Sequence, residues 1–170
     1  MKYQTRTLSV TAISVAGAVV VLYMGTLFPA MHLTFAALAA VFVAVTVIEG
    51  GLQYGVLCFI ATAILGLLLV PERTGALLYL TFFGAYPLVK SVAERQKAQV
   101  LGWIIKFAVF FLALTLYMTI LRELMPGAIP FADRALPLIY PAGAAAFLVY
   151  DIGMSRLIGL YLERIYKYKE

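Results

Sequence analysis

Residues 51–70 read GLQYGVLCFIATAILGLLLV, an apolar run without a charged side chain. A helix needs about 20 apolar residues to cross the hydrocarbon core of a bilayer, so this stretch is long enough to span a membrane. Backbone groups in hydrocarbon must bond internally, and continuous apolar runs favour helices over the alternating strands of a barrel. Five similar segments lie at approximately 8–28, 31–48, 75–90, 101–121 and 137–159. The sequence therefore predicts an all-α integral membrane protein, a bundle of six transmembrane helices.

The composition supports this fold class. The chain is 64% hydrophobic with a mean hydropathy of +0.99, well above a soluble domain. Six spans use most of the 170 residues, so we expect residues 1–170 to form one transmembrane domain. The single cysteine, Cys58, excludes an internal disulfide and a cysteine metal cluster. The first segment has no clear small-residue cleavage site, which favours a retained helix over a signal peptide.

The basic side chains are sorted by position along the chain. Cytoplasmic loops are enriched in Lys and Arg, so we expect both termini in the cytoplasm. A basic inner face also predicts contact with anionic lipid rather than with nucleic acid. Ten of the 13 basic residues share the inner side and three lie outside, namely Lys2, Arg6, Lys90, Arg95, Lys97, Lys106, Arg156, Arg164, Lys167 and Lys169 against Arg73, Arg122 and Arg134.

The connections differ in character. A tight turn is expected at Glu49–Gly50–Gly51. The stretch KSVAERQKAQV, Lys90–Val100, has many helix formers and is expected to continue as an amphipathic helix. The outer connection Arg122–Leu136 contains Pro126 and Pro130, which predict a loop that could cap the outer face.

Small residues four apart predict close helix packing. Ala36, Ala40 and Ala44 form such a stripe in the second segment, and Ala12 and Ala16 form one in the first. Each stripe fits internal packing, and the alternative is a face that docks a partner protein.

Two charged residues are expected at similar depth inside the membrane, Asp151 in the sixth segment and Lys106 in the fifth. Buried charges in a bilayer usually pair, so an intramembrane ion pair is predicted. The pair fits a structural role that fixes helix order, and a coupling or proton-relay role is the alternative. The sequence has neither a His-x-x-x-His spacing nor a glycine-rich phosphate loop, so we predict no enzyme, catalytic residue, metal or cofactor.

The outer half is predicted to hold a small-molecule pocket. Tyr79, Phe83 and Tyr86 share one helical face of the fourth segment and would form its aromatic wall. An aromatic wall with a few polar groups is typical of a ligand pocket, whereas an aromatic belt at the interface is the alternative. The polar groups expected near it at the outer ends are His32, Arg73, Arg122, Asp133 and Arg134.

The chain resembles the substrate-binding (S) components of energy-coupling factor vitamin transporters. The likeness lies in its length, its six spans, its orientation and the pair Ala12-x-x-x-Ala16. The resemblance implies a non-catalytic subunit in a bacterial cytoplasmic membrane that binds a vitamin or micronutrient near the outer face. It also implies partners, a transmembrane coupling protein and ATPase subunits, with Ala12 and Ala16 facing the coupling protein. One alternative is a membrane scaffold of the same fold, like those of bacterial rod-shape assemblies, that recruits partners without transporting. A membrane enzyme or proton-coupled carrier that depends on Asp151 is the other.

Overall fold

The computed structural model describes residues 2–71, 73–95, 99–124 and 132–166. Its described part is helical, without strands, and six of its helical spans are long and apolar enough to cross a membrane. The prediction of an all-helical chain with six membrane-length segments is confirmed. The elements are α1 (Lys2–Met24), η1 (Gly25–Leu27), η2 (Pro29–Met31), α2 (His32–Gly50), α3 (Leu52–Leu69), α4 (Arg73–Leu78), η3 (Tyr79–Phe83), α5 (Tyr86–Ala93), α6 (Gln99–Leu124) and α7 (Ala132–Tyr166).

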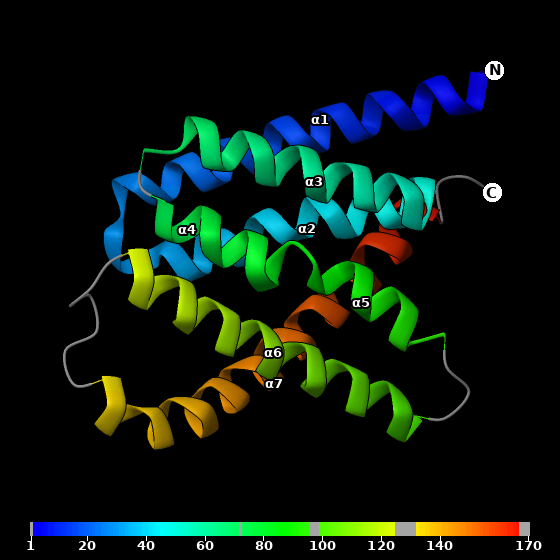
Figure 1. Ribbon diagram of the computed structural model, residues 1–170. Helices are drawn as coiled ribbons and strands as arrows, with labels where there is room; N and C mark the ends of the chain where they lie inside the picture. Colours follow the sequence, from blue (N-terminus) through cyan, green and yellow to red (C-terminus); the bar gives the residue numbers. More distant parts are fainter. Residues whose placement is uncertain (1, 72, 96–98, 125–131, 167–170) are drawn as a thin grey trace. The chain divides into compact units, whose positions relative to one another are not determined.

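The chain separates into two compact units, residues 1–118 and residues 119–170. In the first unit α2 is central and contacts α1, α3, α4 and α5 (Figure 1). The predicted stripe Ala36, Ala40 and Ala44 is buried along α2. Side chains this small let neighbouring helix backbones approach closely. The resulting van der Waals packing stabilises helix association in lipid, where no hydrophobic driving force acts between helices.

The hairpin between α2 and α3 turns at one residue. Gly51 has a φ of 85°, in the left-handed region that glycine adopts without steric cost. Four residues later, Gly55 is buried where an added Cβ would lie 2.9 Å from the Leu88 side chain on α5. The tight turn predicted at Glu49–Gly51 is confirmed.

Large apolar side chains are exposed along the sides of the helices in the first unit. Ile13, Leu68 and Leu112 are 72%, 75% and 72% exposed. Side chains of this size, exposed along helices of membrane length, match hydrocarbon rather than water as the surrounding solvent. The chain has the structure of a multi-pass membrane protein.

The fourth span is interrupted, although the sequence predicted one helix over 75–90. After α4, the residues Tyr79–Phe83 form a π turn, in which the Gly84 amide donates to the Tyr79 carbonyl at 2.8 Å. The helix resumes as α5, with Pro87 in its first turn. Proline has no N–H, and its ring clashes with the carbonyl four residues earlier, which disfavours a regular α-helix at this point.

Two predicted connections need correction. The prediction of a continuous helix through Lys90–Val100 is wrong, because α5 ends at Ala93, residues 94–95 form a turn, and α6 begins at Gln99. The reversal is held by packing, since an added Cβ at Gly102 would lie 3.0 Å from the Ala93 carbonyl oxygen. The outer loop is shorter than Arg122–Leu136, because α6 extends to Leu124 and α7 begins at Ala132. The helix formers that flank the Pro-rich centre extend both helices.

Candidate functional site

Four polar side chains meet in the interior of the first unit. Thr46 from α2, Cys58 and Thr62 from α3 and Tyr79 from the π turn are all 0% exposed. We call these four residues the hydroxyl cluster. The Thr46 hydroxyl donates to the Phe42 carbonyl at 2.7 Å, as threonine commonly does within a helix.

Two hydroxyls of this cluster make no hydrogen bond of regular geometry with the described residues. They are Thr62 Oγ1 and Tyr79 Oη, and the Thr62 hydroxyl lies near both the Cys58 thiol and the Tyr79 hydroxyl. A buried hydroxyl without a partner costs about 1–3 kcal/mol. Such groups are rare in folded proteins, and each requires an explanation.

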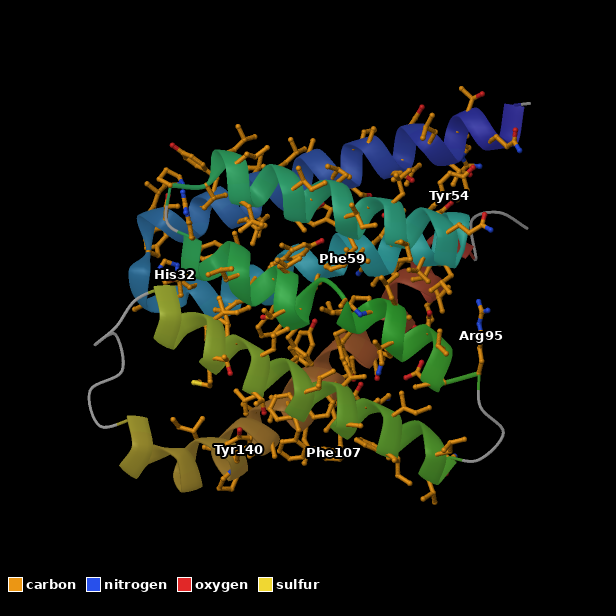
Figure 2. The ribbon with its side chains drawn as sticks, in the orientation of Figure 1. His32, Tyr54, Phe59, Arg95, Phe107 and Tyr140 are labelled. Atoms are coloured by element: carbon orange, nitrogen blue, oxygen red, sulfur yellow. The ribbon has the colours of Figure 1, made fainter. Side chains whose placement is uncertain are left out.

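The absence of a side chain at Gly84 leaves room for the Tyr79 ring. A Cβ added at Gly84 would lie 2.6 Å from Tyr79 Cζ and 2.7 Å from Phe59 Cδ2, so both rings occupy the space where a side chain would be. The Phe59 and Tyr79 rings are 6.0 Å apart between centroids, and Figure 2 marks Phe59 in the middle of the bundle. The π turn, Gly84 and Phe59 thus fix the direction of the Tyr79 side chain toward α3.

The other aromatic residues of the fourth span pack against one another. Phe83 is 6% and Tyr86 0% exposed. Phe82 stacks between them and α6, with its centroid 5.3 Å from Tyr86 and 5.5 Å from Phe110. Phe83 and Tyr86, predicted as pocket walls, therefore lie in packed core, whereas Tyr79 lies beside the unpartnered Thr62 hydroxyl. That Phe83 and Tyr86 line a pocket stays a prediction.

The predicted polar groups of the outer end are distributed over both units. His32 begins α2 and lies against Gly75 of α4, and Arg73 is exposed at the start of α4. In Figure 2 His32 lies at one end of the bundle, and Arg95 lies at the opposite end. Arg122, Asp133 and Arg134 lie on helices of the second unit, and their side chains are outside the described part, so their role in binding stays a prediction.

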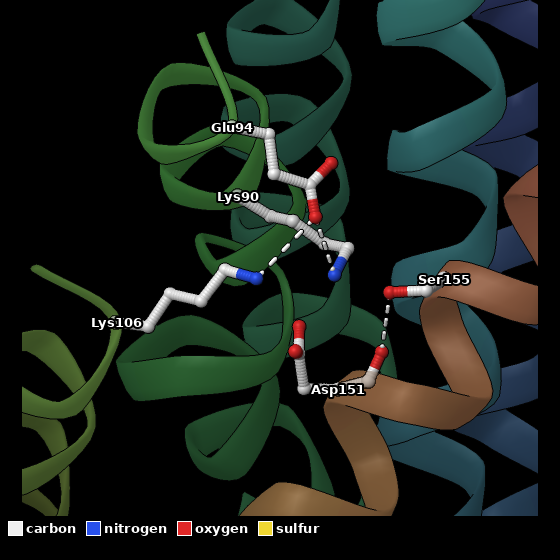
Figure 3. A network of polar contacts seen from close by, with 5 residues as sticks. All are labelled: Lys90, Glu94, Lys106, Asp151 and Ser155. Atoms are coloured by element: carbon white, nitrogen blue, oxygen red, sulfur yellow. Dashed lines mark hydrogen bonds and ion pairs between the residues drawn. The ribbon is translucent and has the colours of Figure 1, made fainter. Parts of the chain in front are cut away.

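At the basic end of the first unit, Glu94 bridges two lysines. Its Oε1 atom lies 2.8 Å from Lys90 Nζ and 3.3 Å from Lys106 Nζ (Figure 3). The lysine side chains are 2% and 8% exposed, whereas Glu94 is 52% exposed. We call Lys90, Glu94 and Lys106 the lysine–glutamate cluster. Glu94 was not among the residues predicted to pair with these lysines, although its spacing of four from Lys90 on a helix was a usable signal.

Asp151 was the predicted partner of Lys106. It lies on α7 in the second unit, where its backbone carbonyl accepts a hydrogen bond from Ser155 Oγ at 2.9 Å (Figure 3). The Asp151–Lys106 ion pair and the alternative relay role both stay predictions.

Ala12 and Ala16 are both exposed on α1. Ser14 is 4% and Ala18 0% exposed, so they pack into the unit, while the two alanines lie on a surface of α1. Their docking role stays a prediction.

The described residues contain no group of three or more His, Cys, Asp or Glu side chains that could hold a metal ion. No family model, curated protein or solved structure matches the chain. Its function is therefore argued from its own residues.

Proposed function

We propose that this chain is a solute-binding membrane subunit of an ATP-driven uptake transporter. The proposed solute is a small polar molecule, such as a water-soluble vitamin or another micronutrient. The observation that carries the proposal is the pair of buried hydroxyls, Thr62 and Tyr79, that lack a hydrogen-bond partner in the described protein. A membrane scaffold needs no unsatisfied polar groups in its interior, so this pair favours solute binding over the scaffold alternative.

The backbone around Tyr79 also supports a binding role. Transporters often bind their substrates at helices that are interrupted within the membrane, and π turns are frequent at functional sites. Tyr79 lies in such a turn, at the interruption between α4 and α5. At 1.5 Å of rise per residue it is about 9 Å from Arg73 along the helix axis, between the predicted outer end and the centre of the span.

Access to the site requires movement, because Thr62 and Tyr79 are 0% exposed. The regular helical hydrogen bonds are already interrupted at η3, so α4 can tilt there without disrupting a continuous α-helix. His32 and Arg73, at the outer end of the same helices, would meet the solute first. Binding would then supply the hydrogen bonds that the two hydroxyls lack.

The proposal predicts that the purified protein is stabilised by a specific solute. Denatured protein should release a small water-soluble molecule detectable by mass spectrometry, and a panel of vitamins and micronutrients should contain one that raises the Tm. Protein that releases no such molecule, and whose Tm is unchanged across the panel, would contradict the proposal.

Tyr79→Phe and Thr62→Val separate binding from folding. Each change removes an unpaired buried hydroxyl and preserves the approximate shape, so the Tm of the solute-free protein should be equal or slightly higher. Solute affinity should fall about 3- to 10-fold, the value of one neutral hydrogen bond, as measured by solute titration. Tyr54→Phe is the matched control, on the first turn of α3 at the other end of the unit (Figure 2). Unaltered affinity in both cluster variants would exclude the hydroxyl cluster as the site.

A further inference from the structure

A pocket lies where α5 ends and α6 begins, away from the hydroxyl cluster. Its volume is about 320 Å³, at the lower end of the range of small-molecule sites. Its lining residues are Ala93, Glu94, Gln99, Gly102, Trp103 and Lys106. All of them belong to the first unit, and they combine a carboxylate, an ammonium, an amide and an indole.

One carboxylate oxygen in this pocket has no partner within the described residues. Both contacts of Glu94 with the lysines use Oε1. Oε2 is left with an open position, on a side chain that is 52% exposed and lines the pocket. A carboxylate oxygen beside an aromatic ring is a favourable partner for an ammonium group, through a charge-assisted hydrogen bond and a cation–π contact.

The lining also offers hydrogen-bond donors. The Trp103 indole N–H and the Gln99 amide make no hydrogen bond within the described ranges, and both side chains are exposed at the pocket. The Lys106 ammonium, which contacts Glu94 Oε1 at 3.3 Å, lies 5.1 Å from the centre of the Trp103 ring and adds positive charge beside the indole. An anionic group would be held here, but a ligand that is only anionic would also face Glu94.

The position of the pocket indicates which molecule carries both charges. Ala93 and Gln99 are the last and first residues of two membrane spans, so the pocket lies at the depth of the lipid headgroups. Tryptophan and lysine are typical of that depth. We propose that this pocket binds the zwitterionic headgroup of phosphatidylethanolamine, with the ammonium on Glu94 Oε2 and the phosphate on Gln99 and Trp103.

The chain contains one tryptophan, so its fluorescence reports on this pocket. Dihexanoyl phosphatidylethanolamine, titrated into detergent-solubilised full-length protein, should change the Trp103 emission in a saturable manner. The phosphatidylglycerol and phosphatidylcholine analogues should bind at least about fivefold more weakly, because the first lacks an ammonium and the second lacks ammonium N–H donors. Glycerophosphoethanolamine, which lacks acyl chains, should also bind more weakly if the ligand is a lipid.

Glu94→Gln should weaken binding of the phosphatidylethanolamine analogue about tenfold, because the charge-assisted bond is lost. The control is Glu163→Gln, which removes an exposed carboxylate of α7 and should leave the titration unchanged. Gln99→Ala gives a second test that leaves the lysine–glutamate cluster intact, with an expected loss of about threefold.

Equal responses to the ethanolamine and glycerol lipids would overturn the proposal, as would undiminished affinity in both Glu94→Gln and Gln99→Ala. Binding of glycerophosphoethanolamine as tight as that of the lipid would identify a soluble zwitterion instead and would overturn the assignment to lipid.

Discussion

Gly84→Ala is expected to destabilise the protein by about 1–3 kcal/mol, the usual cost of overpacking a core. The added methyl would lie 2.6 Å from Tyr79 Cζ and 2.7 Å from Phe59 Cδ2. Tyr79 is 0% exposed, so its ring has little space into which it can move. Because the change displaces Tyr79, it should also reduce the Tm increase produced by the solute. Thermal unfolding in detergent, followed by intrinsic fluorescence, measures both effects.

Gly153→Ala on α7 is the matched control for this experiment. A Cβ added there has no neighbour within 4 Å, so the same chemical change meets open space. Alanine is favoured over glycine within a helix, so this variant should be equal or slightly higher in stability. If Gly84→Ala unfolds at the same temperature as Gly153→Ala, the close packing at the π turn is not a determinant of stability.

The second large effect is expected for association of the chain with a partner protein. Ala12→Leu and Ala16→Leu should each reduce association with the proposed transmembrane coupling protein at least about tenfold, because a leucine side chain prevents the close backbone approach that alanine permits. Both positions are exposed on α1, so the isolated subunit should keep its Tm and its solute affinity. Co-purification of the coupling protein with tagged subunit measures the association.

Ala108→Leu is the control for assembly, because it makes the same change at an exposed position of α6. It should not alter co-purification. Normal recovery of the coupling protein with Ala12→Leu and with Ala16→Leu would exclude this face of α1 as the docking surface. Solute binding by the isolated subunit would be unaffected by that outcome, so the docking face and the solute site are tested separately.

The six spans could be predicted because each depends on local composition. A run such as 51–70 is long and apolar enough to identify a span without knowledge of its neighbours, and α3 covers Leu52–Leu69. The stripe Ala36, Ala40 and Ala44 could also be recognised from its spacing, and it is buried in the structure. In the same way, Gly51 marked the tight turn before α3.

The π turn was harder to predict. Pro87 indicated a local disturbance of the helix, but the hydrogen bonds of the π turn depend on packing around Tyr79 and Gly84. The end of α5 at Ala93 was missed for a related reason. The helix formers of KSVAERQKAQV have favourable intrinsic propensities, and the contact between Gly102 and Ala93 overrides them.

The candidate site could be predicted only in part. Tyr79 was recognised from its position on the aromatic face. Thr62 was not, because a single threonine in an apolar helix is ordinary, and its significance arises only from its nearness to Tyr79 in space. Glu94 was likewise missed as the partner of Lys106, because helix neighbours are set by tertiary packing. One sequence does not specify which side chains of different spans meet.

Cys58 belongs to the hydroxyl cluster and is 0% exposed. The only native thiol of the chain is therefore shielded from water-soluble maleimides while the hydroxyl cluster is closed. The wild-type sequence can then serve as the unreactive background for scanning accessibility, with reporter thiols introduced one at a time into each connection. Labelling of intact cells on this background would assign every connection to its side of the bilayer.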